Sequence, residues 1–214
     1  MNKFLDHIWL ASYPRSGNTF LRSVLFNCFN LRSGSIYPRD LGYNKKLEEY
    51  AGHIEQDANG SIDFQDQKLK IIKTHNYNND HQKTIYVIRD ARPSSLSMYK
   101  FYNKKISLDD IILGNHRFGK WSDHILNWDP LKRNNTLLIK YESLLTNFNE
   151  QLNKISFFLN IKIVNNFLPD RNEIADDDGK WVNRHSNWKE EMPASSIDLC
   201  NKINKELLIK FNYI

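Results

Sequence analysis

The sequence predicts one α/β domain over residues 1–214, with helices on both faces of a mostly parallel central sheet. Two observations predict this three-layer α/β/α arrangement. Four short β-rich runs are nearly continuous in apolar residues, as strands buried on both faces of a parallel sheet should be. These runs are Ile8–Ser12, Leu69–Thr74, Thr84–Arg89 and Thr136–Tyr141. Helical patterns lie between the runs, and such alternation is typical of a doubly wound sheet.

Apolar residues recur at helical spacing in five segments. They are Thr19–Phe29, Ala91–Phe101, Ile111–Trp128, Phe148–Leu159 and Ser195–Ile209. Pro93 fits the first turn of the second helix, and Ser195 or Ser196 is a suitable cap for the last. Residues 30–66 and 166–188 are polar and irregular. We therefore expect these two stretches to form loops over the ligand face.

The composition indicates a globular protein with an anionic ligand. Hydrophobic residues make up 40% of the chain and aromatic residues 13%, which suits one well-buried core. The net charge of +5 favours an anionic partner. The chain has no Lys/Arg-rich block of the kind that would indicate binding to nucleic acid. Cys28 and Cys200 lie far apart, which predicts two buried thiols rather than a disulfide or a zinc site.

The chain shows no membrane-targeting pattern. No apolar run approaches the length of a membrane span, and the segment Met1–His7 lacks the apolar region of a signal peptide. These observations predict a cytoplasmic, soluble protein without a membrane span. They leave its oligomeric state open.

The first strand is followed by a loop suited to holding an anion. It reads Tyr13-Pro14-Arg15-Ser16-Gly17-Asn18-Thr19-Phe20. A strand-to-helix junction presents free backbone N–H groups and the positive end of a helix dipole to one point. Arg15 adds a fixed charge, and Gly17 lets the backbone approach closely. The hydroxyls of Ser16 and Thr19 add donors. We expect a phosphate or sulfate site here; the alternative is an ordinary turn with a solvated Arg15.

The second predicted strand ends in Lys73-Thr74-His75. Side chains alternate along a strand, so Lys73 and His75 should point to the same side. An imidazole can take a proton from a hydroxyl, and an ammonium can stabilise negative charge on a group in transfer. This pair predicts a transfer site. The alternative for His75 is a loop histidine hydrogen-bonded to the backbone.

The third predicted strand ends at Arg89, and Ser97 lies eight residues further on, inside the next helix. A guanidinium grips phosphate in a bidentate manner, so Arg89 and Ser97 predict a second phosphate site. Arg89 could instead pair with Asp90. Arg92 could cover the same surface or itself pair with Asp90.

In this order along residues 8–160, these segments resemble the sulfotransferase family. The loop Tyr13–Phe20 is similar to the family's 5′-phosphosulfate loop, commonly Y-P-K-S-G-T-T-W, and Lys73-Thr74-His75 is similar to its K-T-H. Arg89 and Ser97 have the arrangement of its 3′-phosphate site. Two further matches are the pattern Gly119-x-Trp121-x-x-His124-x-x-x-Trp128 and the strand that ends in Tyr141-Glu142.

The resemblance implies a P-loop-like fold and the donor 3′-phosphoadenosine-5′-phosphosulfate (PAPS), with adenosine 3′,5′-bisphosphate as product and no metal. It implies that His75 is the catalytic base, assisted by Lys73 and Arg15. It implies that Lys73 and His124 border the acceptor, although the two tryptophans beside His124 also fit a plain core stripe. The donor-binding residues that it implies are Arg15, Ser16, Gly17, Asn18, Thr19, Phe20, Arg89, Ser97, Tyr141 and Arg184.

The sequence also departs from the family pattern. Arg15 replaces the usual lysine, and Phe20 replaces the usual tryptophan. Near the C-terminus only Arg184 and Trp188-Lys189 match the family's R-K-G-x-x-G-D-W-K, and residues 160–190 are short. A short lid favours an open cleft, which suits a glycan or a larger natural product better than an enclosed small phenol. The expected partner is a small-molecule or glycan acceptor. Two alternatives stay open: a non-catalytic nucleotide-binding module, and a degenerate P-loop kinase that needs magnesium.

Overall fold

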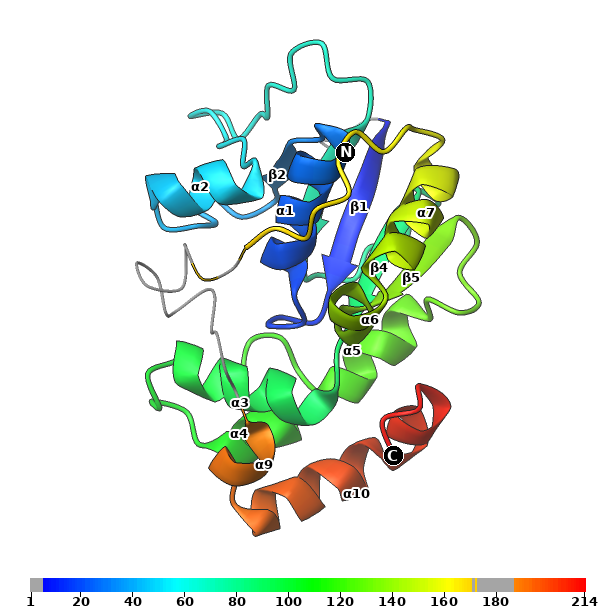
Figure 1. The fold of residues 1–214 in the computed structure, drawn as a ribbon. Helices are drawn as coiled ribbons and strands as arrows, with labels where there is room; N and C mark the ends of the chain where they lie inside the picture. The colour runs from blue at the N-terminus through cyan, green and yellow to red at the C-terminus, as the bar shows by residue number, and fades with distance from the viewer. Residues whose placement is uncertain (1–5, 171, 173–186) are drawn as a thin grey trace.

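A computed structural model describes residues 6–170, 172 and 187–214 and shows a five-stranded sheet with helices on both faces (Figure 1). The strands are β1 (His7–Ser12), β2 (Ser33–Ser35), β3 (Lys70–Thr74), β4 (Thr84–Ile88) and β5 (Thr136–Lys140). Their order across the sheet is β2-β3-β1-β4-β5, and every pair is parallel. This confirms the predicted fold class. The carboxyl ends of all five strands therefore meet at one edge of the sheet.

Alternation along the strands divides the core into two layers. In β1, Ile8 and Leu10 belong to one buried cluster, whereas Trp9 and Ala11 belong to the other. The strands are apolar on both faces because each face is covered by helices. Leu10 and Ala11 are fully buried, as expected for the central strand of such a sheet.

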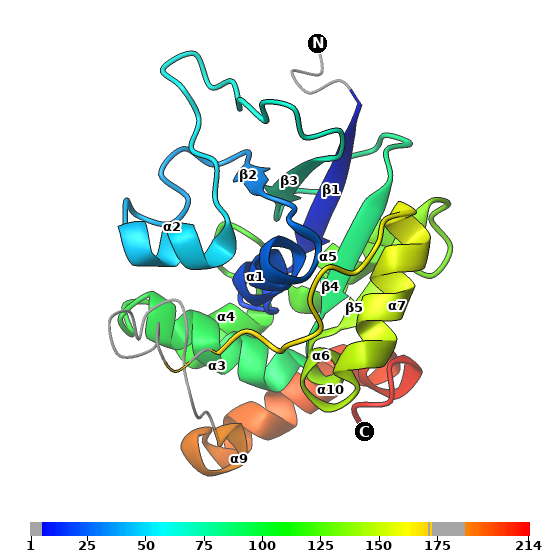
Figure 2. The same cartoon turned by 45° about the horizontal axis from the view of Figure 1, so that its top comes forward.

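Helices cover both faces of the sheet (Figures 1 and 2). One layer holds α1 (Asn18–Phe29), α6 (Tyr141–Thr146) and α7 (Phe148–Leu159). The other holds α3 (Ala91–Phe101), α4 (Leu108–Leu113), α5 (Trp121–Trp128) and α10 (Ala194–Lys210). Two further helices contact these layers: α2 (Lys45–Ala51) contacts α1, and α9 (Trp188–Glu191) contacts α3.

Four sequence predictions of local structure were wrong. The segment Ile111–Trp128 is not one helix, because Gly114 ends α4 with φ 80° and α5 begins only at Trp121. The stretch 30–66 contains β2 and α2. The predicted strand Thr136–Tyr141 ends at Lys140, and Tyr141 begins a separate helix, α6. The last helix begins at Ala194 after Pro193, and no side chain caps it.

Both cysteines have the predicted state. Cys28 lies in α1 and Cys200 in α10, and both are buried free thiols. Within the described residues, none of the helices has the length and apolar character needed to cross a membrane.

Candidate functional site

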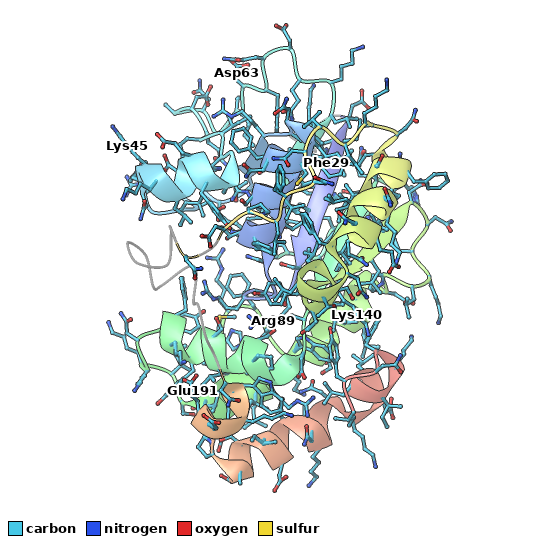
Figure 3. All side chains as sticks on the ribbon, in the orientation of Figure 1. Phe29, Lys45, Asp63, Arg89, Lys140 and Glu191 are labelled. Atoms are coloured by element: carbon cyan, nitrogen blue, oxygen red, sulfur yellow. The ribbon has the colours of Figure 1, made fainter. Side chains whose placement is uncertain are left out.

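A cavity of about 750 Å³ lies at the carboxyl edge of the sheet. Its walls come from the β1–α1 loop, the connection between β2 and α2, the ends of β3 and β4, the helix α3 and the α4–α5 loop. Segments far apart in sequence therefore converge here, as parallel strand ends require. Figure 3 shows one of the lining residues, Arg89, between the sheet and α3.

The β1–α1 loop forms a tight cradle at the N-terminus of α1. Gly17 is the residue before the helix and has φ 96°, a left-handed conformation that favours glycine. A Cβ at this position would overlap the ring of Tyr141, so glycine is also needed for space. The side chain of Asn18 ties the start of α1 to β1. Its Nδ2 donates to the carbonyl of Leu10 at 3.1 Å and to Oγ of Ser12 at 3.2 Å.

Most of the predicted anion loop lines the cavity. Arg15, Gly17, Asn18, Thr19 and Phe20 are all part of its wall. Ser16 is fully buried and is not part of the cavity wall. Its hydroxyl has no hydrogen-bond partner within the part of the chain that the structure describes.

Arg15, Arg89 and Ser97 come together as the strand-end argument predicts. Nε of Arg15 donates to Oγ of Ser97 at 3.0 Å, and Nη1 of Arg89 donates to the carbonyl of Arg15 at 3.1 Å. Two guanidiniums thus line the cavity, where their charges favour an anionic ligand. Asp90 pairs with Arg92 at 2.6 Å, so this carboxylate is the partner of Arg92 rather than of Arg89.

The guanidiniums of these two arginines lie over aromatic rings. The guanidinium of Arg15 lies 5.1 Å from the ring centre of Phe101, and that of Arg89 lies 4.5 Å from the ring centre of Tyr141. Tyr141 also meets Phe20 edge-on, with ring centres 6.1 Å apart. Phe20 and Tyr141 both line the cavity, so they offer a flat ligand group an aromatic surface beside the cations.

The orientation of His75 leaves one ring nitrogen for chemistry. Its Nδ1 lies 2.7 Å from the carbonyl of Ser12, and because a carbonyl only accepts, Nδ1 carries the proton. Nε2 is then the basic nitrogen of the neutral ring. Burial, and secondly the charge of Lys73, lower the pKa of His75 well below its usual range. The ring therefore stays neutral at physiological pH, as a general base must be.

Two aromatic side chains hold the His75 ring. Tyr37 stacks on it with ring centres 5.8 Å apart and planes 26° from parallel, and Phe118 meets it edge-on at 5.7 Å. The hydroxyl of Tyr37 also accepts a hydrogen bond from the backbone N–H of His75 at 3.0 Å. His75 is therefore fixed at its backbone, at Nδ1 and on its ring face.

Lys73 lines the same cavity but is not a free cation. Its ammonium pairs with Oδ1 of Asp40, while Oδ2 of Asp40 accepts from Nη1 of Arg22 at 2.7 Å. All three side chains are buried, at 4%, 3% and 0% exposure respectively. Burial alone would raise the pKa of Asp40, but the charges of Lys73 and Arg22 outweigh it and hold that pKa well below its usual range. Asp40 is therefore ionised.

We expect Asp40→Asn to destabilise the fold, because it leaves two buried cations without a counter-charge. Loss of one partner from a buried ion pair typically costs about 3–5 kcal/mol. Urea unfolding measures the free energy directly. The matched control is Glu150→Gln, which breaks the exposed pair with Lys154 and should change stability by less than about 1 kcal/mol. An Asp40→Asn protein as stable as this control would contradict the ionised cluster.

His124 lies behind the cavity wall rather than in it. Its Nδ1 accepts from the hydroxyl of Tyr86 at 2.7 Å, and its Nε2 donates to the carbonyl of His75 at 2.9 Å. Burial lowers its pKa to about 4, so the ring is neutral. His124 would therefore act on a ligand only indirectly, by holding the backbone of His75 in position. Trp121 has a similar supporting place, since its Nε1 donates to the carbonyl of Arg89 at 3.0 Å.

Several cavity residues were missed by sequence reasoning. Tyr37, Arg39 and Asp40 lie in the stretch 30–66, which was predicted to form loops over the ligand face but without any named site residue. Arg117 lies in the segment that was predicted to be helix. No sequence motif marks any of these residues. For Arg117, the available signal was Gly119, which interrupts the helical pattern. Arg184, which was predicted to bind the donor, lies outside the described residues.

Comparison with known sequences gives a consistent result. The family model described as the sulfotransferase domain matches residues 5–206. Sulfotransferase 1 family member D1 of Mus musculus is 28% identical over 174 residues, which cover 72% of this chain and 59% of that protein. Sulfotransferase 2B1 of Homo sapiens is 27% identical over 172 residues, covering 72% and 46%. The match thus spans less than two thirds of the length of these relatives.

Solved structures show the same fold. The mouse sulfotransferase SULT7A1 complexed with PAP aligns with a TM-score of 0.68 and 23% identity, covering 95% of this chain and 84% of that one. Retinol dehydratase in complex with androsterone and the inactive cofactor PAP aligns with a TM-score of 0.67 and 15% identity, covering 95% and 80%.

Proposed function

The chain belongs to the sulfotransferase family, and from this premise we propose that it transfers a sulfuryl group from PAPS to an acceptor hydroxyl or amine. The observation that supports this most is the arrangement around His75. A neutral imidazole, with Nδ1 bound to a carbonyl, shares one cavity with Lys73, Arg15 and Arg89. Binding a nucleotide alone would need the cations but no oriented base.

The residues of the cavity fit a donor of this kind. Arg15 and the α1 N-terminus would hold the 5′-phosphate, because the left-handed Gly17 keeps the helix dipole and N–H groups accessible. Arg89 and Ser97 would hold the 3′-phosphate, and Phe20 with Tyr141 would contact the adenosine. In the two aligned structures PAP is the bound nucleotide, which supports the same donor class here.

The donor, when bound, supplies a sulfuryl group and leaves as adenosine 3′,5′-bisphosphate. The chain's own residues supply proton transfer and charge. Nε2 of His75 would take the proton of the acceptor hydroxyl as its oxygen bonds to sulfur. Lys73 and Arg15 would stabilise the negative charge that grows on the oxygen from which sulfur departs. Asp40 would keep the Lys73 ammonium in place for that role.

A transfer assay tests the proposal. The protein is incubated with ³⁵S-labelled PAPS and a panel of phenols and glycosides, without added metal. We expect acceptor-dependent release of adenosine 3′,5′-bisphosphate, with the label on an acceptor. Tight binding of adenosine 3′,5′-bisphosphate without label transfer to any member of the panel would favour a non-catalytic binding module instead.

A further inference from the structure

The cavity holds two cations that the proposed donor does not use. The cationic side chains that line it are Arg15, Arg39, Lys73, Arg89 and Arg117. Under the proposed function, the donor's phosphates and sulfuryl group occupy Arg15, Lys73 and Arg89. The carboxylate that lines the cavity, among the described residues, is Asp40, and its charge is already matched by Arg22 and Lys73. Arg39 and Arg117 are therefore left for the acceptor.

Of these two, Arg117 lies nearer the proposed base. Its guanidinium lies 5.7 Å from the ring centre of Tyr37 and 5.3 Å from that of Phe118. Both rings also contact His75, so the guanidinium and the imidazole share the same two aromatic neighbours. Arg39 instead lies over Tyr43, with 5.4 Å between the guanidinium and the ring centre.

The loop that bears Arg117 is held by hydrogen bonds. Nδ1 of His116 accepts from the backbone N–H of Phe118 at 3.3 Å, which leaves Nε2 to donate to the hydroxyl of Tyr13 at 3.0 Å. That hydroxyl in turn donates to the carbonyl of Gly119 at 3.2 Å. The backbone on both sides of Arg117 is thus tied to Tyr13, the first residue of the anion loop.

Arg117 is available for a ligand. Its side chain is exposed, and it has no ion pair with any carboxylate in the described parts of the chain. A guanidinium offers a planar fork that matches carboxylate, sulfate or phosphate. The rings of Tyr37 and Phe118 beside it offer an apolar face to an aryl or sugar ring.

We propose that the acceptor is an anion: a hydroxylated aryl or sugar ring with a carboxylate, sulfate or phosphate group that Arg117 binds while the hydroxyl meets His75. This inference rests on the proposed sulfuryl transfer. It assigns Arg117 as a specificity-determining residue, because a neutral acceptor would offer its guanidinium no counter-charge. Where the bound acceptor covers the guanidinium from solvent, a charge-assisted hydrogen bond of this kind gives roughly a ten- to hundred-fold preference.

Two matched acceptor pairs test the inference. Each pair differs only in charge: 4-hydroxyphenylacetate with 4-hydroxyphenylacetamide, and methyl β-glucuronide with its primary amide. The ratio of kcat/KM for the acid to kcat/KM for the amide is measured in the wild type, in Arg117→Gln and in Lys205→Gln. Lys205 is exposed on α10 and does not line the cavity, so this control removes the same charge elsewhere.

We expect the wild type to prefer the acid of at least one pair roughly ten- to hundred-fold. Arg117→Gln should lower that ratio at least about tenfold, while Lys205→Gln keeps it. Equal use of acid and amide by the wild type, survival of the preference in Arg117→Gln, or transfer to neutral acceptors only would overturn the inference. Failure to bind adenosine 3′,5′-bisphosphate would instead count against the proposed function itself.

Discussion

Replacement of His75 by alanine should lower kcat by about 10²–10⁴-fold while leaving the affinity for adenosine 3′,5′-bisphosphate nearly unchanged. The expectation follows from geometry: Nδ1 donates to the carbonyl of Ser12, so Nε2 is the nitrogen that can take a proton. Under the proposed function, donor contacts would come chiefly from Arg15 and Arg89, which line the cavity and which the variant retains. The loss should therefore fall on the chemical step.

Single-turnover transfer and calorimetric titration of the same proteins measure the two quantities. The matched control is His81→Ala, which removes an exposed histidine that does not line the cavity and should have no effect. Exogenous imidazole should restore part of the rate to His75→Ala only. If transfer stays within a few-fold of wild type, His75 is not the base; if affinity falls in step with rate, its role is to hold the donor.

The lowered pKa of His75 also sets the expected pH dependence. The base must be neutral, so activity should fall as pH decreases through the pKa of His75 in the free enzyme. Because burial and Lys73 lower that pKa, the acid limb of kcat/KM should lie below the ordinary histidine value of about 6.5. The His75→Ala protein should lack this limb.

Replacement of Arg89 by alanine should weaken the binding of adenosine 3′,5′-bisphosphate by roughly ten- to a hundred-fold. This corresponds to the loss of charge-assisted hydrogen bonds worth about 1.5–3 kcal/mol. Arg89 lies at the end of β4 over the ring of Tyr141, where a 3′-phosphate could also reach Ser97.

A second nucleotide makes this test specific. Adenosine 5′-phosphate lacks the 3′-phosphate, so Arg89→Ala should bind it almost as well as the wild type does. Arg89 also donates to the carbonyl of Arg15, and the variant could instead disturb the 5′-phosphate cradle. Equal losses for both nucleotides would assign Arg89 to the support of that cradle rather than to the 3′-phosphate.

The strand ends are where sequence reasoning predicted the site well. The runs that became β1, β3, β4 and β5 are apolar because both faces of the sheet are covered, so they could be recognised without an alignment. Parallel strands place their carboxyl ends together, and this brought Arg15, His75 and Arg89 to one cavity. Their roles in transfer remain predictions.

Elements held by distant partners could not be predicted in the same way. Strand β2 consists of Ser33-Gly34-Ser35, which has no apolar pattern, and it forms by pairing with β3. Asp40 is separated from Lys73 by 33 residues and carries no motif. The helical spacing continued through 111–128 in spite of Gly114 and Gly119, whose left-handed conformations bound the loop that presents Arg117.

The central claim is that this cavity binds a 3′-phosphorylated adenine nucleotide as its donor, and the melting temperature tests it most directly. A ligand at a hundred times its Kd stabilises the fold by about 2.7 kcal/mol, which raises the melting temperature of a protein of this size by several degrees. We predict that rise with adenosine 3′,5′-bisphosphate in the presence of a chelator, and little change with ATP and Mg²⁺. A rise with ATP and Mg²⁺, together with none from the bisphosphate, would contradict the claim and favour a kinase.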